Sequence, residues 1–409
     1  MKFTLSWLSD HLETQASASE IAERLTMIGH EVEAVHDRGR ELGDFFVAAV
    51  LTAEPHPNAD KLKVCTVDTG AERLQVVCGA PNARAGMKGI FAPVGTTVPG
   101  TGLALKRAAI RGIESAGMLL SARELNLSDD HTGIIEVAPE FATGTPAAVA
   151  LGLADPLFDV AITPNRGDCL GVRGIARDLA AAGLGRLKPL KLEPVAGSFA
   201  SPIAVKLAFD AETANACSFF VGRTIRGVRN GPSPRWMQER LSAIGLRPIS
   251  ALVDITNYLT YDLNRPLHVF DAEKVRGDLR VRLSRDGEML TALNGQTYTL
   301  DTEMTVITDD SEVESLGGVM GGARTGCTGE TTTVFLESAL FDPIRTARTG
   351  RTLGILSDAR FRFERGIDPS FLIDGLEIAT RIVLELCGGE PSEIDRKSTR
   401  LNSSHTSVS

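Results

Sequence analysis

The segment from Asp44 to Leu127 is a succession of short β-rich runs, and it constrains the fold more than any other part of the chain. The runs KLKVCTVDTG, RLQVVCGA, KGIFAPVGTTV and LALKRAAIRG are separated by Gly, Pro and Asn. Short strands punctuated by turn residues are typical of a small β-barrel. We therefore predict a barrel in this segment, with other structure on either side of it.

The region before the barrel has a helical pattern. Ser17 and Glu20 have the spacing of a capping box, Ile21 and Leu25 lie on one helical stripe, and Gly29 follows as a stop signal. We expect the first forty residues to be helical.

Helical character returns after the barrel, in TPNRGDCLGVRGIARDLAAAGLG, where Asp168 is expected to be a helix N-cap. The run LKPLKLEPVAGSFASP has the composition of a linker, and residues 203–393 mix strands with a few helices. A chain of 409 residues exceeds one ordinary core, so two to four domains are expected.

The composition is that of a soluble globular protein, with 43% hydrophobic and 23% charged residues. No apolar run approaches the length that crosses a bilayer, and Asp10, His11 and Glu13 lie where a signal peptide would be apolar. We therefore expect a cytoplasmic protein.

Histidines and cysteines give no metal-binding pattern. The six cysteines contain no C-x-x-C pair, which argues against a zinc site and a disulfide framework. His30, Glu31 and His36 resemble the letters of a zinc protease, but on a helix the two imidazoles would lie on different faces. We predict no metal site.

The barrel segment is locally basic in an acidic chain. The whole chain has a net charge of −9, whereas residues 45–127 contain nine Lys or Arg and six Asp or Glu. Basic side chains on strands and loop tips can follow a phosphate backbone, although a solvated barrel surface explains the charge about as well. Aromatic residues are few, so stacking on single-stranded bases is not indicated.

Three motifs in this segment, HPNADKL, VVCGAPN and GMLLSARELNL, resemble in order and spacing the tRNA-binding OB-fold domain of several tRNA-associated proteins. The resemblance covers residues 40–147 and implies contact with tRNA by shape and backbone. The candidate tRNA-binding residues are Lys61, Lys63, Arg84, Lys88 and Arg111.

The third region collects groups that could bind and hydrolyse an ester. They are the cation of Arg247, the hydroxyl of Thr256, the amide of Asn257, the imidazole of His268 and the carboxylate of Glu337. The glycine-rich run SLGGVMGG, residues 315–322, lies between the last two. The run lacks the spacing of a nucleotide-binding fingerprint. It either forms a tight turn or lets backbone N–H groups approach a ligand.

His268 lies in LNRPLHVFDAE, among apolar neighbours. It could be a catalytic base, or a core histidine with its hydrogen bonds satisfied. Metal ligation is the least supported role, because no second His or Cys lies at ligand spacing. Arg247 could contact a phosphate or form a surface ion pair.

Taken together, the helical start, the embedded barrel and the third region resemble the N-terminal part of the β subunit of bacterial phenylalanyl-tRNA synthetase, over residues 1 to about 395. In that family the third region is the editing domain, which removes tyrosine wrongly attached to phenylalanine tRNA. The resemblance implies catalytic roles for His268, Glu337, Thr256 and Arg247, and substrate-binding roles for Gly321, Ser357, Ala359 and Asn257. At Ser357 the family more often has threonine, which keeps the hydroxyl.

The physics of selection is consistent with this resemblance. A pocket for phenylalanine favours phenylalanine over a ligand with one additional hydroxyl group by only about 10²-fold. A second site must therefore recognise the hydroxyl, and Glu337 could accept its hydrogen bond. Phenylalanine would leave that carboxylate unpaired, at about 1–3 kcal/mol.

The resemblance predicts an α+β multidomain fold: residues 1–39 and 148–195 as a helical or α+β region, 40–147 as the OB-fold, and 200–395 as a mixed α/β editing domain. Residues 397–409 are Ser/Thr-rich and are expected to be a disordered, non-native tail.

The implied partners are tRNA(Phe) and the α subunit of an α₂β₂ enzyme. We expect no cofactor in this chain, whereas the family's full-length enzyme uses ATP and Mg²⁺. A free-standing deacylase and an inert tRNA-docking module remain alternatives.

Overall fold

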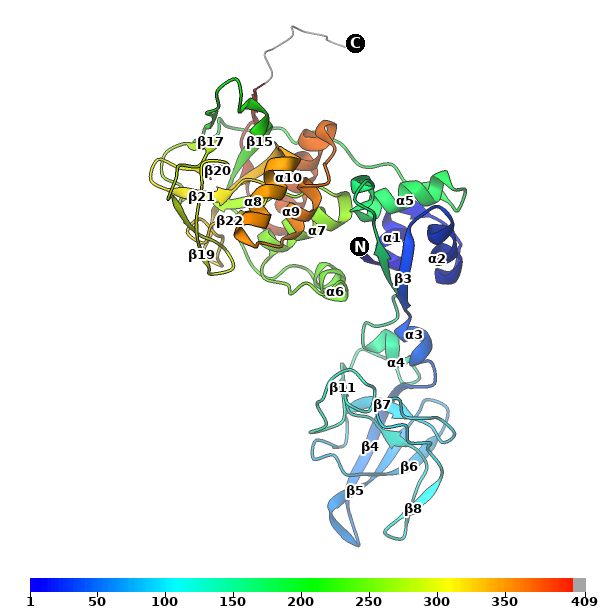
Figure 1. Cartoon of the computed structure of the whole chain (residues 1–409). Helices are drawn as coiled ribbons and strands as arrows, with labels where there is room; N and C mark the ends of the chain where they lie inside the picture. The colour runs from blue at the N-terminus through cyan, green and yellow to red at the C-terminus, as the bar shows by residue number, and fades with distance from the viewer. Residues whose placement is uncertain (400–409) are drawn as a thin grey trace. The chain divides into compact units, whose positions relative to one another are not determined.

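The computed structural model describes residues 1–399. The described residues form two compact units, residues 35–157 and residues 1–34 together with 158–399. We call them the small unit and the large unit and describe each by itself (Figure 1). The predicted mixture of helices and sheets is confirmed, and the predicted domain boundaries stay predictions.

The small unit is built on a six-stranded antiparallel sheet with the order β10-β7-β4-β5-β6 and β11 beside β7. Its strands are β4 (Phe46–His56), β5 (Ala59–Asp68), β6 (Arg73–Cys78), β7 (Lys88–Ala92), β10 (Met118–Leu119) and β11 (Glu136–Val137). The Ala116 N–H donates to the Gln75 carbonyl at 2.9 Å and so joins the β10 end of the sheet to β6.

Alternating side chains account for the core of this sheet. Cys65 and Val67 on β5, and Val76 and Cys78 on β6, are buried while the residues between them are not. A hairpin and two short helices complete the unit: β8 (Ala108–Ile110), β9 (Ile113–Ser115), α3 (Arg38–Glu41) and α4 (Ala147–Ala150).

The N-terminal part of the large unit is α+β. It contains β1 (Lys2–Thr4), α1 (Leu5–His11), β2 (Leu12–Glu13), α2 (Ala18–Met27), α5 (Val172–Ala181) and β13 (Arg186–Leu187). The predicted capping box at Ser17 and Glu20 is present, and Ile21 and Leu25 are buried.

Two predictions for this part were wrong. The chain is not helical up to residue 40, because β3 (Glu31–His36) pairs with β12 (Leu157–Ala161), a partner 120 residues away that no local pattern indicates. Asp168 is not a helix N-cap, because the cap of α5 is Gly171 and Asp168 instead pairs with Arg166 and Arg177.

Two sheets face each other in the remainder of the large unit. The first has the order β16-β23-β15-β24 with β25 also beside β15, and the second has the order β14-β17-β20-β21-β22. The first consists of β15 (Cys217–Arg226), β16 (His268–Asp271), β23 (Thr333–Phe341), β24 (Glu390–Pro391) and β25 (Asp395–Ser398). The second consists of β14 (Val205–Leu207), β17 (Leu279–Leu283), β20 (Thr305–Thr308), β21 (Val313–Leu316) and β22 (Met320–Gly321).

An apolar core fills the space between these sheets. Phe220, Phe270 and Phe335 from the first sheet pack with Val281 and Ile307 from the second. The small hairpin of β18 (Met289–Thr291) and β19 (Thr297–Thr299) lies beside β21.

Helices surround these sheets. α10 (Leu372–Cys387) lies against β15 and β23 of the first sheet (Figure 1), α7 (Ala251–Leu263) contacts α10 and β16, and α6 (Arg235–Ala243) packs against α7. α8 (Pro343–Leu353) contacts β20 of the second sheet, and α9 (Asp358–Phe363) packs against α8. The buried Arg223 guanidinium on β15 donates to Glu377 on α10 at 3.1 Å, which ties this helix to the sheet. Among the described residues no helix is long and apolar enough to cross a membrane.

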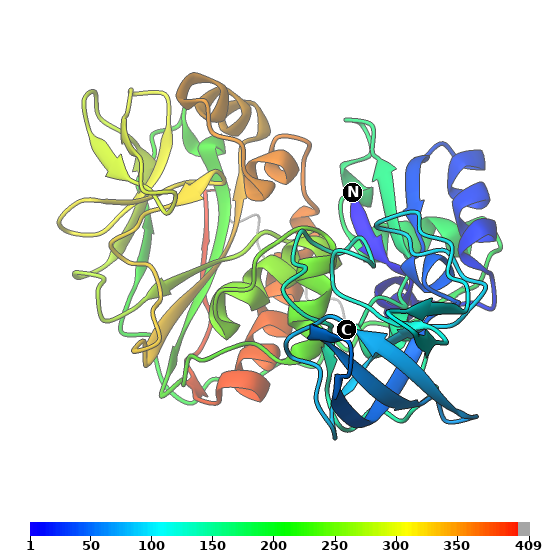
Figure 2. The ribbon, with the colours of Figure 1, turned by 90° about the horizontal axis from the view of Figure 1, so that it is seen from below.

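The predicted disordered tail does not begin at Lys397. Residues 395–398 form β25, which extends beside β15 and is visible in red in Figure 2. Strand pairing uses backbone N–H and C=O groups, so a polar sequence can extend a sheet edge. The rest of the predicted tail, residues 400–409, lies outside the described residues.

Candidate active site

A small cavity of about 60 Å³ lies where β16, β22, β23 and α9 meet. Four of the predicted site residues line it, namely His268, Gly321, Glu337 and Ala359. Its other walls are formed by Pro266, Leu267, Ser315, Leu316, Gly318, Val319, Met320, Phe341 and Phe363. Segments separated by up to about a hundred residues therefore converge on one point.

Strand pairing places the imidazole beside the carboxyl group. His268 on β16 is the direct antiparallel partner of Glu337 on β23. Opposite residues of such a pair project from the same face of the sheet. That face is the inner one, because Phe270 and Phe335, each two residues along from the pair on its own strand, belong to the core between the sheets.

Glu337 is a buried acid without a protein partner. Its side chain is 6% exposed, and Oε2 has no hydrogen-bond partner among the described residues. Burial raises the pKa of Glu337 to about 8, because the low-dielectric surroundings disfavour the charged form. The group is therefore a carboxylic acid at neutral pH, and it can both donate and accept a hydrogen bond.

His268 is not a core histidine with satisfied hydrogen bonds. Its Nε2 is buried and has no partner within the described part of the chain. Burial lowers the pKa of His268 to about 4, so the ring is neutral at pH 7. The edge-to-face packing of the imidazole on Phe270, with ring centres 4.3 Å apart, holds the ring in place.

The glycine-rich run makes room for the imidazole. A Cβ on Gly321 would lie 2.3 Å from Cε1 of His268, so only glycine allows this approach. Gly318 adopts a left-handed φ of 71° at the turn into β22. The Gly322 N–H already donates to the Glu314 carbonyl at 2.7 Å. The observed roles of these glycines are thus a turn and close packing.

Ser357 supports the cavity from behind. Its hydroxyl accepts from the Arg360 N–H at 3.1 Å as the N-cap of α9, and it donates to the Val319 carbonyl at 2.6 Å. It thereby joins the helix that carries Ala359 to the turn that carries Val319.

Besides Ser357, three more predicted site residues do not line the cavity. Thr256 and Asn257 lie on α7, where the Thr256 hydroxyl donates to the Val253 carbonyl at 2.8 Å. Arg247 is exposed in the loop between α6 and α7, and it has no ion pair or hydrogen bond to any described residue. The surface ion pair considered for it is therefore not formed.

Several lining residues were not singled out from the sequence. Phe341 follows Glu337 by four positions on one strand, so the two-residue period of a strand would have found it. Ser315, Leu267 and Phe363 lie inside the motif segments, but their direction depends on packing between distant segments.

The five predicted tRNA-binding residues differ in whether their side chains already form hydrogen bonds or ion pairs within the protein. Lys63 donates to the carbonyls of Pro81 and Ala83, and Lys88 donates to those of Pro139 and Phe141. The third engaged residue is Arg84, which pairs with Glu136.

Lys61 and Arg111, in contrast, have no side-chain partner in residues 1–399 and are exposed. The Asn58 amide donates to the Arg111 carbonyl at 3.1 Å, which ties the β4–β5 turn to the β8–β9 turn.

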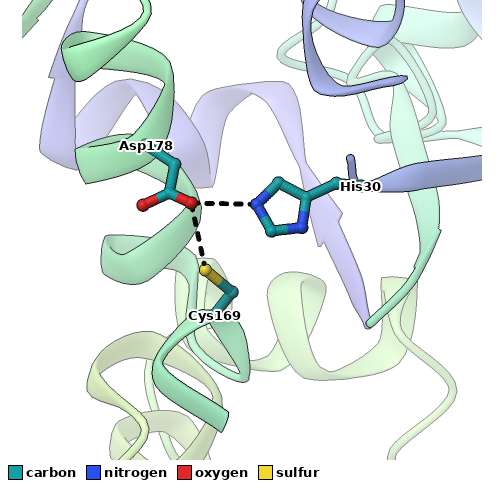
Figure 3. Close-up of side chains that lie close together, drawn as sticks. All are labelled: His30, Cys169 and Asp178. Carbon is teal, nitrogen blue, oxygen red and sulfur yellow. Dashed lines mark hydrogen bonds and ion pairs between the residues drawn. The ribbon is translucent and has the colours of Figure 1, made fainter. Parts of the chain in front are cut away.

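A His/Cys/Asp cluster was not predicted. His30 Nε2 lies 3.0 Å from Asp178 Oδ2, and the Cys169 thiol donates to the same oxygen at 3.4 Å (Figure 3). Arg166 and Arg177 bond to this carboxylate group as well. Two guanidinium groups neutralise it and repel a cation, so the arrangement is that of an ion-pair network joining α5 to the N-terminal segment.

Two family models match the chain. Residues 45–146 match the model described as "Putative tRNA binding domain", and residues 216–388 match the "B3/4 domain". The fold and these matches define a class of protein that joins a tRNA-binding domain to a B3/4 domain.

Similarity to curated proteins over almost the whole chain is more specific than these two domain matches. The phenylalanine–tRNA ligase beta subunit of Paramagnetospirillum magneticum is 61% identical over 393 residues, which is 96% of this chain and 49% of that protein. That of Cereibacter sphaeroides is 59% identical over 401 residues, 96% of this chain and 50% of that protein. The predicted resemblance to these β subunits is confirmed, and the chain spans about half the length of the curated relatives it matches.

Among solved structures, an N-terminal fragment of the phenylalanyl-tRNA synthetase beta-subunit from Pyrococcus horikoshii is 14% identical with a TM-score of 0.33. The match covers 58% of this chain and 63% of that one, and a likeness at this level defines neither fold nor function.

Proposed function

We propose that the chain acts in phenylalanine–tRNA ligase as a tRNA-binding and editing β subunit, and that its large unit hydrolyses tyrosine from mischarged tRNA(Phe). The observation that carries the proposal is the His268–Glu337 pair, in which two residues that line one cavity each hold a buried polar atom without a hydrogen-bond partner in residues 1–399. Such atoms are costly unless a ligand or water satisfies them.

In the proposed reaction a water oxygen attacks the ester carbonyl carbon, and the bond from that carbon to the ribose oxygen breaks. The neutral His268 takes a proton from the water and passes it to the ribose oxygen, which leaves as a hydroxyl. Glu337 recognises the phenol of tyrosine. Because its pKa is about 8, the acid donates to the phenol oxygen at neutral pH, whereas the ionised form would accept from it.

The cavity must open to admit this substrate. Its volume of about 60 Å³ is enough for about two water molecules, whereas pockets for small ligands span about 300–1,000 Å³. The segment 315–322 and the start of α9 are joined through Ser357 and Val319, and we infer that they move together when the ester enters.

The small unit is proposed to be an OB-fold that holds the tRNA by its backbone. Under this proposal aminoacylation, with ATP and Mg²⁺, takes place on an α subunit in an α₂β₂ assembly, in the cytoplasm.

The test is deacylation of Tyr-tRNA(Phe) and Phe-tRNA(Phe) by the chain, with Glu337→Ala as the variant. We expect the unaltered chain to prefer the tyrosyl ester and the variant to lose about tenfold or more of that preference, as expected for one hydrogen bond in a buried site. The matched control is Glu330→Ala, which removes an exposed carboxylate from the same unit. Unchanged selectivity in Glu337→Ala would contradict the recognition role.

The same assay separates the alternatives. An absence of deacylation by the unaltered chain, with and without an α subunit, favours an inert docking module. Full activity that an α subunit does not alter favours a free-standing deacylase.

A further inference from the structure

A second, larger cavity is lined in part by the segment that leads into β16, through Leu263, Asn264 and Arg265. It has a volume of about 520 Å³, which is within the range of small-molecule sites. Apolar side chains form much of its wall, including Leu187, Leu190, Ile367 and Phe371. We call it the arginine cavity, because Arg173, Arg177 and Arg265 also line it.

Arg265 is a buried cation with two donors unused. Its side chain is 1% exposed and packs over Gly375 of α10, where a Cβ would lie 2.8 Å from Cγ of Arg265. Nη2 donates to the Asp368 carbonyl, but Nε and Nη1 have no partner within the described chain. Burial lowers the pKa of Arg265 only to about 10, so the group stays charged at neutral pH.

No carboxylate of the described residues forms an ion pair with Arg265, although Asp368, which lines the same cavity together with Asp168, attracts the guanidinium at longer range. Asp368 uses its carboxylate to accept from the N–H and the hydroxyl of Ser370, and Asp168 pairs with Arg166 and Arg177. Arg173 donates to the Lys188 carbonyl at 3.0 Å and has no carboxylate at ion-pair distance in residues 1–399. Within residues 1–399, two of the three lining arginines, Arg173 and Arg265, thus form no ion pair and feel Asp262 and Asp368 only at longer range.

Asn264 adds a buried acceptor to the same wall. Its Nδ2 donates to the Gly167 carbonyl at 2.8 Å, which leaves Oδ1 without a partner among residues that the structure describes. An unpaired acceptor beside unpaired cationic donors is a costly combination in an empty protein. A ligand with both an anionic group and a hydrogen-bond donor would satisfy both.

We propose that the arginine cavity binds a small organic anion, with one carboxylate or phosphate group toward Arg265 and an apolar body against Leu187, Leu190, Ile367 and Phe371. Guanidinium groups are the preferred partners of both anions. The site is distinct from the candidate active site, although Arg265 directly precedes Pro266, which lines that other cavity. It does not depend on the proposed editing reaction.

Calorimetric titration of the full chain with four probes tests the proposal. Hydrocinnamate and phenyl phosphate carry both an apolar body and an anion, hydrocinnamamide has the body without the charge, and inorganic phosphate has the charge without the body. We expect one organic anion to bind with a stoichiometry of one, and about tenfold or more tighter than the amide or inorganic phosphate. The tighter of the two head groups identifies the ligand class.

Two variants locate the binding. Arg265→Leu removes the buried cation, and Leu190→Glu adds a negative charge on a partly exposed wall position outside any helix or strand. Each should weaken binding about tenfold or more, whereas the control Arg351→Leu, which removes an exposed arginine from α8, should leave it unchanged.

If Arg265→Leu does not fold, Leu190→Glu by itself decides the location. A failure of both organic anions to bind the unaltered chain at millimolar concentration overturns the proposal, and so does unchanged binding in Leu190→Glu. Equal affinities for inorganic phosphate and phenyl phosphate would contradict the proposed contact between the apolar body of the ligand and the cavity wall. None of these results depends on tRNA deacylation, so this proposal and the editing proposal fail separately.

Discussion

At the scale of single residues, Glu337 and the Nε2 atom of the half-buried His268 are shielded from solvent, and burial shifts the pKa values of the two groups in opposite directions. The acid is held neutral by a raised pKa and the imidazole is held neutral by a lowered pKa. Neither charge is available to stabilise the other, so the site is prepared for a polar, uncharged ligand such as a phenol or a water.

The raised pKa of Glu337 makes stability depend on pH. Between the ordinary value of 4.5 and about 8 the folded state keeps a proton that the unfolded state has lost, so the free energy of unfolding falls as pH rises. Glu337→Gln cannot titrate, so its stability relative to the unaltered chain should increase from pH 5 to 8, by about 1.4 kcal/mol per unit of pKa shift.

Urea unfolding followed by fluorescence at several pH values measures this difference. A difference that is constant across the range would mean that the Glu337 carboxyl is not desolvated in the folded protein. Glu330→Gln, at an exposed position, is the control and should show no such trend.

His268 gives a second prediction at this scale. His268→Ala removes the only imidazole that lines the described cavity, and we expect the deacylation rate to fall about 10²- to 10⁴-fold, as for loss of a general base. The comparison is with His131→Ala, an exposed histidine of the small unit. A rate within threefold of the unaltered chain (roughly 0.7 kcal/mol in barrier height) would remove His268 from the reaction.

At the scale of elements, the site depends on one turn and two strands that approach closely. Gly321→Ala would place a Cβ 2.3 Å from the His268 ring, so the ring or β22 must move. We expect a loss of about 1–3 kcal/mol in stability together with lower deacylation activity. The control is Gly329→Ala, where an added Cβ meets nothing within 4 Å.

Thermal melting and the deacylation assay are the measurements for this pair. If Gly321→Ala matches Gly329→Ala in both, the close approach of β22 to His268 is not required.

Ser357 gives another prediction for an element, the N-terminus of α9. Ser357→Ala removes both the cap to Arg360 and the bond to Val319, at a cost of about 1–2 kcal/mol, whereas Ser357→Thr keeps a hydroxyl at the same place. Urea midpoints should therefore rank Ser and Thr above Ala. Equal midpoints for Thr and Ala would show that the hydroxyl does not hold the helix to the turn.

At the scale of the whole molecule, tRNA binding should depend on those basic residues whose side chains form no hydrogen bond or ion pair with described residues of the protein. Lys61→Ala and Arg111→Ala should each weaken tRNA affinity and reduce the salt dependence by about one phosphate contact. Lys63→Ala and Lys88→Ala should instead lower the melting temperature, because these ammonium groups bind backbone carbonyls. Filter binding at several salt concentrations separates the two classes, and an equal loss of affinity in all four variants would contradict the distinction.

The sequence by itself determined much at short range. The capping box of α2, the β-rich segment and the identity of the groups at the site follow from spacing and residue type, because a helix cap or a strand period is set by neighbours a few positions away. Motifs also indicated which residues to compare with a known family, and that resemblance is confirmed.

The tertiary structure decided what depends on distant partners. It made residues 31–36 a strand through β12 and residues 395–398 an edge strand through β15, and it paired His268 with Glu337 while Thr256, Asn257 and Arg247 do not line the cavity. It also left Nε and Nη1 of the buried Arg265 without a hydrogen-bond partner among the described residues. Burial and pairing are properties of surfaces brought together from far along the chain, and no local pattern specifies which surfaces meet.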